Sequence, residues 1–337
     1  MNIDLLKRLG NINQIAGIRV STLRRGRGAS MDIAEFYNAA GLRFTVLPDR
    51  CMDLNDLSYK GINLSFQSKN GLISGASFES SPGSFCDEWP GGMLATCGLD
   101  NVGEGYDDGD IYPTHGRIAS IPADHFGTSA SWQGDEYVLC ATGQMQQSRL
   151  FGRNLLLERT LQTTLDSKSI TLTDRLTNRE PEDEPFMLLY HFNFGYPLLT
   201  EESVIYHTKT TVQPRGEHSK DHLHMTPPVD GQPEAFFQHI TTGKTAACAI
   251  VNPALHLGAY IRFDTENLPY FGQWKNMRSH DYVLAIEPCN CFGRGRHQEI
   301  EDGTIATIKA YSTLEFRLEL GVLDGDEEIA RFIEENC

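Results

Sequence analysis

Alternation of apolar and polar residues with a period of two is the feature that most restricts the fold of this chain. It is clearest at 170–176 and 314–320, where apolar side chains occupy every second position. Successive side chains of a β-strand point to opposite faces, so this pattern is typical of strands with one buried face. Strands are also expected at 42–46 and 304–308, and helical periodicity is scarce between the two ends of the chain. The sequence therefore predicts a mainly β protein built from antiparallel strands.

Turn residues indicate how some of these strands are connected. Asp166 and Ser167 separate 155–165 from 170–176, which predicts a hairpin, and Asp302-Gly303 predicts a turn before 304–308. The acidic, proline-flanked stretch 181–185 is expected to be an exposed loop rather than a domain boundary. We therefore expect residues 1–337 to form one domain, a large twisted antiparallel β-sandwich.

Short helices are expected near the two ends of the chain. Asp4 can cap a helix that stops at Gly10, and Asp326 can cap a helix over 327–335. In the second helix, apolar residues spaced by three and four positions lie on one face, which predicts packing against the body of the protein.

Composition excludes several classes of partner. The 337 residues carry a formal net charge of −16, which argues against nucleic acid or an anionic membrane surface as a partner. No stretch approaches the roughly 20 apolar residues of a membrane span, and the N-terminal residues lack the apolar region of a signal peptide. The eight cysteines lack a paired CxxC spacing, which favours free thiols in the cytoplasm. Cys289 and Cys291 could bind a metal or act in redox chemistry, but they supply only two of the four ligands that zinc prefers.

Three blocks place a titratable side chain where an apolar run meets a loop. The run that starts at Pro185 leads to His191, a second run ends at Glu287, and His115 follows a loop rich in Gly and Asp. Two histidines and a carboxylate suit general acid-base chemistry. The same trio could also form a facial metal triad, and His191 is equally consistent with a buried structural histidine.

The order of the motifs resembles that of the aldose 1-epimerases, also called galactose mutarotases. The similar segments are 172–178, 190–193 and 286–290, with a His-Gly pair at 115–116 upstream of them. Residues 49–54, 91–99 and 114–118 resemble the DUF4432 branch of that superfamily more closely. The resemblance extends from about Asp49 to about Leu320.

This resemblance implies a β-sandwich with a sugar-binding groove on one face, a monosaccharide or modified monosaccharide as substrate, and no metal or organic cofactor. It implies that Glu287 is the general base, His191 the general acid and His115 a second acid or a substrate anchor. Two family features are not found: the substrate-binding arginine before the first histidine, and an aspartate whose region is occupied here by 273–275.

The implied chemistry is coherent with these residues. Interconversion of α and β anomers removes a proton from the anomeric O1 and adds one to the ring oxygen O5, so that the ring opens and closes on its other face. One base and one acid suffice for both steps. Five further side chains are candidates for substrate binding: Arg50, Arg117, Asn193, Trp274 and Lys275. Three of them are cations that could pair with an anionic sugar, while Trp89 either lines the groove or shapes a loop.

Other functions remain open at this stage. The chain could be a non-catalytic carbohydrate-binding or sensing protein, or a phosphosugar epimerase with the same fold. A polysaccharide lyase is disfavoured because it generally needs a longer cleft and often a helical domain. The sequence does not identify the sugar, and it leaves a homodimer open.

Overall fold

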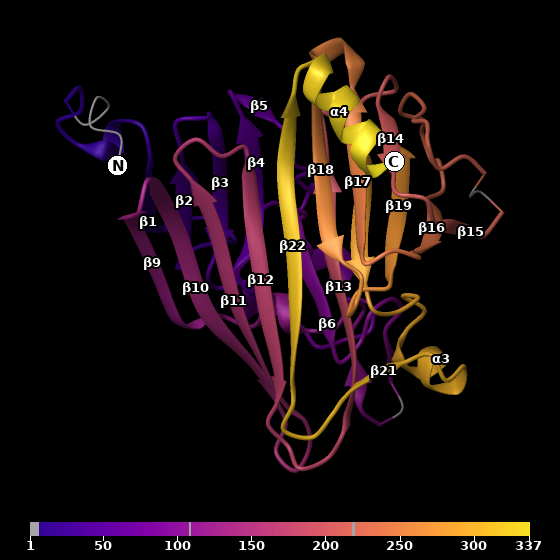
Figure 1. The fold of residues 1–337 in the computed structure, drawn as a ribbon. Coiled ribbons are helices and arrows are strands. Elements are labelled where there is room, and N and C mark those ends of the chain that lie inside the picture. The colour runs from indigo at the N-terminus through magenta and orange to yellow at the C-terminus, as the bar shows by residue number, and fades with distance from the viewer. Residues whose placement is uncertain (1–6, 108, 218–219) are drawn as a thin grey trace.

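The computed structural model describes residues 7–107, 109–217 and 220–337. These residues form two large antiparallel sheets that pack face to face, and a third sheet of two short strands (Figure 1). The mainly β architecture is the one that the alternation predicts. The start of the helix expected after Asp4 lies outside the described residues.

The first large sheet has twelve strands: β1 (Gly17–Thr22), β2 (Asp32–Tyr37), β3 (Leu42–Leu47), β4 (Asp53–Tyr59), β5 (Ile62–Asn63), β6 (Leu94–Leu99), β13 (Glu184–Phe194), β15 (Thr211–Arg215), β16 (Ala235–Ile240), β19 (Tyr270–Arg278), β20 (Asp281–Cys289) and β21 (Ala306–Ile308). Its order is β1-β2-β3-β4-β6-β13-β20-β19-β16-β15, with β5 paired to β4 and β21 paired to β13. Strand β13 is therefore central, with β6 on one side and β20 on the other.

The second large sheet has eight strands: β9 (Asp124–Gln133), β10 (Glu136–Ser148), β11 (Asn154–Thr164), β12 (Ser169–Asn178), β14 (Val204–His207), β17 (Thr245–Asn252), β18 (Leu257–Asp264) and β22 (Thr313–Asp324). Its order is β14-β17-β18-β22-β12-β11-β10-β9, and β7 (Tyr106–Asp107) pairs with β8 (Ile111–Tyr112) in the small sheet. The predicted hairpin is confirmed as β11 and β12, and the strand predicted at 314–320 lies within β22.

The helices are short: α2 (Phe85–Glu88), α3 (Arg296–Glu301), α4 (Asp326–Asn336), and the 3-10 turns η1 (Ile12–Gln14), η2 (Gly75–Ser77), η3 (Ile118–Ser120) and η4 (Pro253–Leu255). Helices α2 and α3 are internal, in addition to the helix that was expected at the C-terminus. Helix α4 was expected, but Asp326 is its first helical residue rather than its cap. The Asp326 carboxylate instead lies 2.9 Å from His256 Nδ1.

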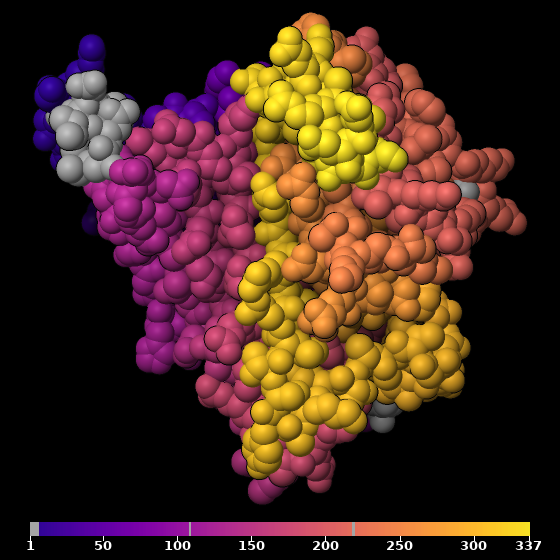
Figure 2. Space-filling model, in the orientation of Figure 1, coloured from indigo at the N-terminus to yellow at the C-terminus, as the bar shows by residue number. Residues whose placement is uncertain are grey.

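Helix α4 covers the outer face of the eight-stranded sheet. Ile329 and Phe332 pack on Ala247, Ala249 and Val251 of β17. Figure 1 shows the helix lying across these strands, and in Figure 2 its residues stand out, in yellow, on this face of the molecule. In the part of the chain that the structure describes, no helix is long and apolar enough to cross a membrane.

A buried arginine joins the two sheets through the core. Arg159 on β11 makes a bidentate ion pair with Asp174 on β12, at 2.7 and 2.9 Å, and reaches Asp53 on β4 at 3.0 Å. Its remaining donors bond to the Cys51 carbonyl and to Thr96 Oγ1 on β6, so all five N–H groups are used. Arg159 is 1% exposed and Asp174 is 0% exposed, so neither charge has water as an alternative partner.

Replacing this arginine should destabilise the fold strongly. Arg159→Met would leave the Asp174 and Asp53 carboxylates buried without their cation, and loss of one partner from a buried ion pair costs about 3–5 kcal/mol. Arg175→Met, an exposed position on the same β12 strand, is the matched control and should change the free energy of unfolding by less than about 0.5 kcal/mol. Chemical denaturation of both variants measures the difference, and an equal effect at the two positions would contradict this role.

Candidate active site

His191 lies on the outer face of the twelve-stranded sheet. On β13, Leu188, Tyr190 and Phe192 point into the core between the sheets, so their alternate neighbour His191 points outward. The strand does not end at this histidine, as the sequence suggested, but continues to Phe194. His191 is only 5% exposed, because segments that follow β5 and β6 cover this face.

Glu287 contacts His191 directly. It lies on the adjacent strand β20, where Leu284 and Ile286 point into the core and Glu287 points to the same outer face as His191. Glu287 Oε1 is 3.2 Å from His191 Nε2, and the glutamate is 2% exposed. A titratable acid and a titratable base are therefore in contact at the centre of the sheet.

Gly272 on β19 leaves room for this carboxyl group. It is the cross-strand partner of Glu287, and a Cβ atom at this position would stand 2.6 Å from Glu287 Oε2. Side chains at directly opposed positions of neighbouring strands are in contact, so any residue other than glycine would displace the carboxyl group.

Three aromatic rings lie against His191, and a fourth packs on one of them. Trp89 and Trp274 lie 5.4 and 5.7 Å from the His191 ring, and the His115 ring lies 5.8 Å from it, measured between ring centroids. Phe85 in α2 packs on His115 at 4.8 Å. Phe85, Trp89, Trp274 and His115 are each partly exposed, whereas His191 and Glu287 are buried beneath them.

Two polar atoms in this aromatic wall are unpaired. Trp89 Nε1 and His115 Nδ1 are buried and have no hydrogen-bond partner among the described residues. The Trp274 indole N–H, in contrast, donates to Glu234 at 2.8 Å. Because an unpaired buried polar atom is costly, these two atoms are available to bond to a ligand or to water.

Burial reverses the usual order of the pKa values of the central pair. It raises the pKa of Glu287 to about 8, against a lowering effect of Arg215, and it lowers the pKa of His191 to about 4. Burial and the nearby His191 lower the pKa of His115 to about 3. Near neutral pH the uncharged forms are therefore favoured, and the contact between Nε2 and Oε1 holds one exchangeable proton.

The other predicted contacts are placed differently. Lys275 points to the face of β19 opposite Trp274, where its ammonium bonds to the Asp221 and His224 carbonyls. Arg50 is buried and bonds to the Ile73 carbonyl. Arg117 lies 3.4 Å from Asp100 and bonds to Ser80 and to the Ile111 carbonyl. None of these three cations is brought to the His191–Glu287 pair.

Asn193 is also not at an exposed surface. It is 0% exposed and contacts His191 Nδ1, so it lies inside the wall of the site, behind the imidazole. The trio of His115, His191 and Glu287 does not show metal-site geometry, since no group of three His, Cys, Asp or Glu among the described residues is arranged to hold an ion.

Sequence analysis missed several groups near the pair. Arg215 on β15 is close enough to Glu287 to lower the pKa of that carboxyl, and it also bonds to the Phe292 and Gly293 carbonyls. Gln238 is the cross-strand partner of Gly272, on the same outer face. Gly272 could have been identified from the sequence, because a glycine inside a strand often marks a position where another group approaches closely. No local sequence pattern indicated Arg215 or Gln238. Their strands, β15 and β16, lie near the site only because of the strand order in the folded sheet.

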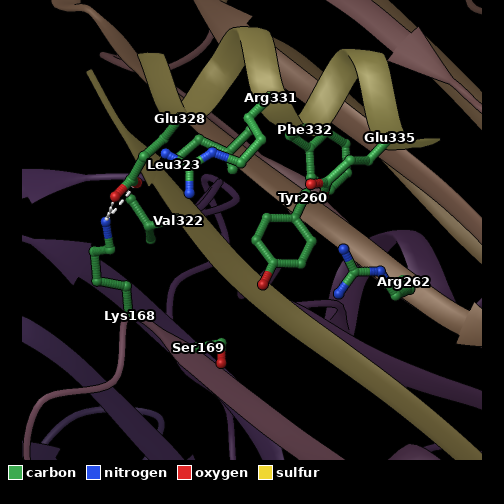
Figure 3. Close-up of a pocket in the computed structure, with 10 residues that line it drawn as sticks. All are labelled: Lys168, Ser169, Tyr260, Arg262, Val322, Leu323, Glu328, Arg331, Phe332 and Glu335. Carbon is green, nitrogen blue, oxygen red and sulfur yellow. Dashed lines mark hydrogen bonds and ion pairs between the residues drawn. The ribbon is translucent and has the colours of Figure 1, made fainter. Parts of the chain in front are cut away.

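A cleft of about 290 Å3 also lies under α4, on the outer face of the other large sheet (Figure 3). Two of its cations have carboxylate partners: Lys168 pairs with Glu328, and Arg262 pairs with Glu319, which also accepts from the Tyr260 hydroxyl. These ion pairs are partly exposed, whereas the acid and base on β13 and β20 are in contact and buried, so that pair is the stronger candidate.

Comparisons with known proteins agree with this fold. Residues 28–322 match the model of a domain of unknown function, DUF4432. A candidate aldose 1-epimerase from Klebsiella pneumoniae has a similar structure, with a TM-score of 0.90 and 22% identity over 99% of this chain and 90% of that one.

Two more distant structures share the same architecture. A galactose mutarotase-like protein from Clostridium acetobutylicum matches with a TM-score of 0.60 and 12% identity over 93% of this chain and all of that one. A galactose 1-epimerase from Lactobacillus acidophilus matches with a TM-score of 0.57 and 12% identity over 92% and 99% of the two chains. At these identities the likeness shows the fold alone. No curated protein matches this chain.

The raised pKa of Glu287 predicts how stability depends on pH. Between pH 4.5 and about 8 the folded protein keeps a proton on Glu287 that the unfolded chain releases, so this group destabilises the fold increasingly as pH rises. Glu287→Gln removes that dependence. We expect wild type to lose stability relative to this variant as pH rises from 5 to 8, by at most about 1.4 kcal/mol per pH unit.

His191 has the opposite effect on the pH dependence of stability. Because its pKa is lowered in the folded state, the folded protein gains stability as pH rises from about 4 to 6.5. Denaturant unfolding at several pH values measures both effects, with Glu266→Gln as the control for loss of an exposed carboxylate. A constant difference between wild type and Glu287→Gln over pH 5–8 would show that Glu287 is not held protonated.

Proposed function

Since this chain belongs to the DUF4432 family and has the galactose mutarotase-like fold, we propose that it is a sugar epimerase that interconverts α and β anomers of an aldose or modified aldose. The observation that carries the proposal is the 3.2 Å contact between Glu287 Oε1 and His191 Nε2. The two reacting oxygens of the sugar, O1 and O5, are bonded to the same carbon. An acid and a base that serve them both must therefore lie next to each other.

The proton balance of the reaction fits this pair. Glu287 as carboxylate takes the proton from O1, and His191 as imidazolium gives one to O5. The C1–O5 bond breaks, and O1 becomes the carbonyl oxygen of the open-chain aldehyde. After rotation about the C1–C2 bond, His191 takes the O5 proton back and Glu287 returns one to O1. The pair ends with the single proton with which it began.

The reactive charge state is reached within the pair itself. Near neutral pH the exchangeable proton rests on Glu287, because burial favours the neutral form of each partner. Transfer of this proton from Oε1 to Nε2 produces the carboxylate and the imidazolium together, without exchange with solvent. Hydroxyl groups of a bound sugar would stabilise both charges as the transition state forms.

The surroundings of the pair suit a monosaccharide. The ring faces of Trp89 and Trp274 offer apolar surface for the C–H groups of a pyranose, while Trp89 Nε1 and His115 Nδ1 can bond to its hydroxyls. His115 is uncharged near neutral pH, so its role in this proposal is to anchor a hydroxyl rather than to donate the proton.

Substitution of the pair should separate catalysis from binding. Glu287→Gln retains the shape and hydrogen bonds of the side chain but cannot accept the O1 proton, so kcat for anomer exchange should fall about 10²- to 10⁴-fold while sugar affinity is retained. His191→Asn should show a similar loss, and the double variant should lose less than the product of the two effects.

Exchange NMR of the two anomers, with the spontaneous rate subtracted, measures kcat, and calorimetry measures affinity. Glu319→Gln and His256→Asn make the same chemical changes on the other large sheet and at the protein surface, and serve as matched controls. Full activity of Glu287→Gln would remove the base from the proposal, whereas sugar binding by the wild type with no exchange above the spontaneous rate would favour a carbohydrate-binding protein.

A further inference from the structure

We propose that Asn193 is a positioning residue, which fixes the tautomer and ring orientation of His191 so that Nε2 faces Glu287. The effect of Asn193 on catalysis rests on the proposed function. The tautomer of His191 does not, because it can be observed without an activity assay.

The orientation of the Asn193 amide follows from its hydrogen bonds. Its Nδ2 donates to the Gly92 carbonyl at 2.9 Å and to the His191 carbonyl at 2.8 Å. The opposite orientation would place the amide oxygen against two carbonyl oxygens, with no donor between them. The amide oxygen Oδ1 is therefore the atom that contacts His191 Nδ1.

Because Oδ1 can only accept, His191 must donate from Nδ1. In neutral imidazole one ring nitrogen carries the proton and the other carries the lone pair, so the lone pair lies on Nε2. Nε2 is the atom at 3.2 Å from Glu287 Oε1. The proton that the proposed reaction uses can then pass only through Nε2, since the Nδ1 proton stays bonded to Asn193.

The strand geometry supplies this contact. Residues 191 and 193 are two positions apart on β13 and share its outer face, so the amide lies beside the imidazole. Gly92 brings the carbonyl that anchors the amide. It has φ of +97°, and a Cβ atom there would stand 2.8 Å from the Leu54 carbonyl, so another residue could not bring its backbone to this position.

Asn193 does not touch the sugar in this arrangement, because it is 0% exposed. The titratable groups that face His191 are Glu287 on β20 and His115 in the loop after β8, with the rings of Trp89 and Trp274 on the remaining sides. A change at residue 193 should therefore alter kcat and its pH dependence through His191, with little effect on KM.

The direct test is 15N NMR of the His191 imidazole in the unliganded wild-type protein near pH 7. We expect the shift pattern of a neutral ring with its proton on Nδ1, and a mixture of tautomers in Asn193→Ala. A wild-type ring protonated on Nε2 would overturn the inference, whether or not the protein epimerises sugars.

The kinetic test uses two variants. Asn193→Ala should lower kcat by about tenfold or more with KM within about twofold, because the wrong tautomer withholds Nε2 from the reaction. Asn193→Asp keeps an acceptor at Nδ1 and adds a negative charge, but it loses the two amide donors to the Gly92 and His191 carbonyls. It should therefore also lower kcat, while the added charge shifts the acidic limb of the kcat profile upward by about one pH unit. Wild-type kcat and an unchanged pH profile in Asn193→Ala would contradict the inference. If the wild type shows the Nδ1 tautomer but does not accelerate anomer exchange, only the proposed function is contradicted.

Discussion

The buried Arg159 cation is the interaction on which the rest of the structure depends. Its partners come from both large sheets, with Asp174 on β12 and Asp53 and Thr96 on β4 and β6. Tyr190 joins the same network by donating its hydroxyl to Asp174 at 2.8 Å. Tyr190 directly precedes His191 on β13, so the network that ties the sheets together on one face of the strand also fixes the backbone that carries His191 on the other. A charge with no alternative partner therefore defines the position of the candidate site.

Burial then gives that site its chemistry. An exposed glutamate and histidine at neutral pH would form an ordinary ion pair with little tendency to exchange protons. Beneath the aromatic rings, the pKa of Glu287 is raised to about 8 and that of His191 is lowered to about 4, so both charged forms are disfavoured until polar groups of a ligand arrive. In the proposed function, the same rings that bury the pair offer apolar surface to a sugar. Asn193 and Gly272 contribute differently: one orients the imidazole and the other leaves space for the carboxyl group.

Much of the fold could be predicted from the sequence, because period-two alternation and turn residues act locally. They identified β12, β22 and the β11–β12 hairpin correctly. The site was harder, because its members come from β13, β19, β20 and loops that meet only after the strands are ordered. Trp274 and Lys275 illustrate this limit: both were expected at the substrate, yet neighbours on one strand face opposite ways, and only Trp274 reaches His191. Internal helix α2, which carries Phe85 over His115, has too few residues for a periodic signal.

The central claim is that the adjacent acid and base act on a sugar, and it is tested most directly by anomer exchange with the wild-type protein. Two-dimensional exchange NMR would be applied to a panel of neutral, phosphorylated and acidic aldoses in matched buffer. The account predicts that at least one aldose exchanges anomers faster than its spontaneous rate, in proportion to protein concentration. Binding of a sugar without acceleration of exchange across the whole panel would contradict it.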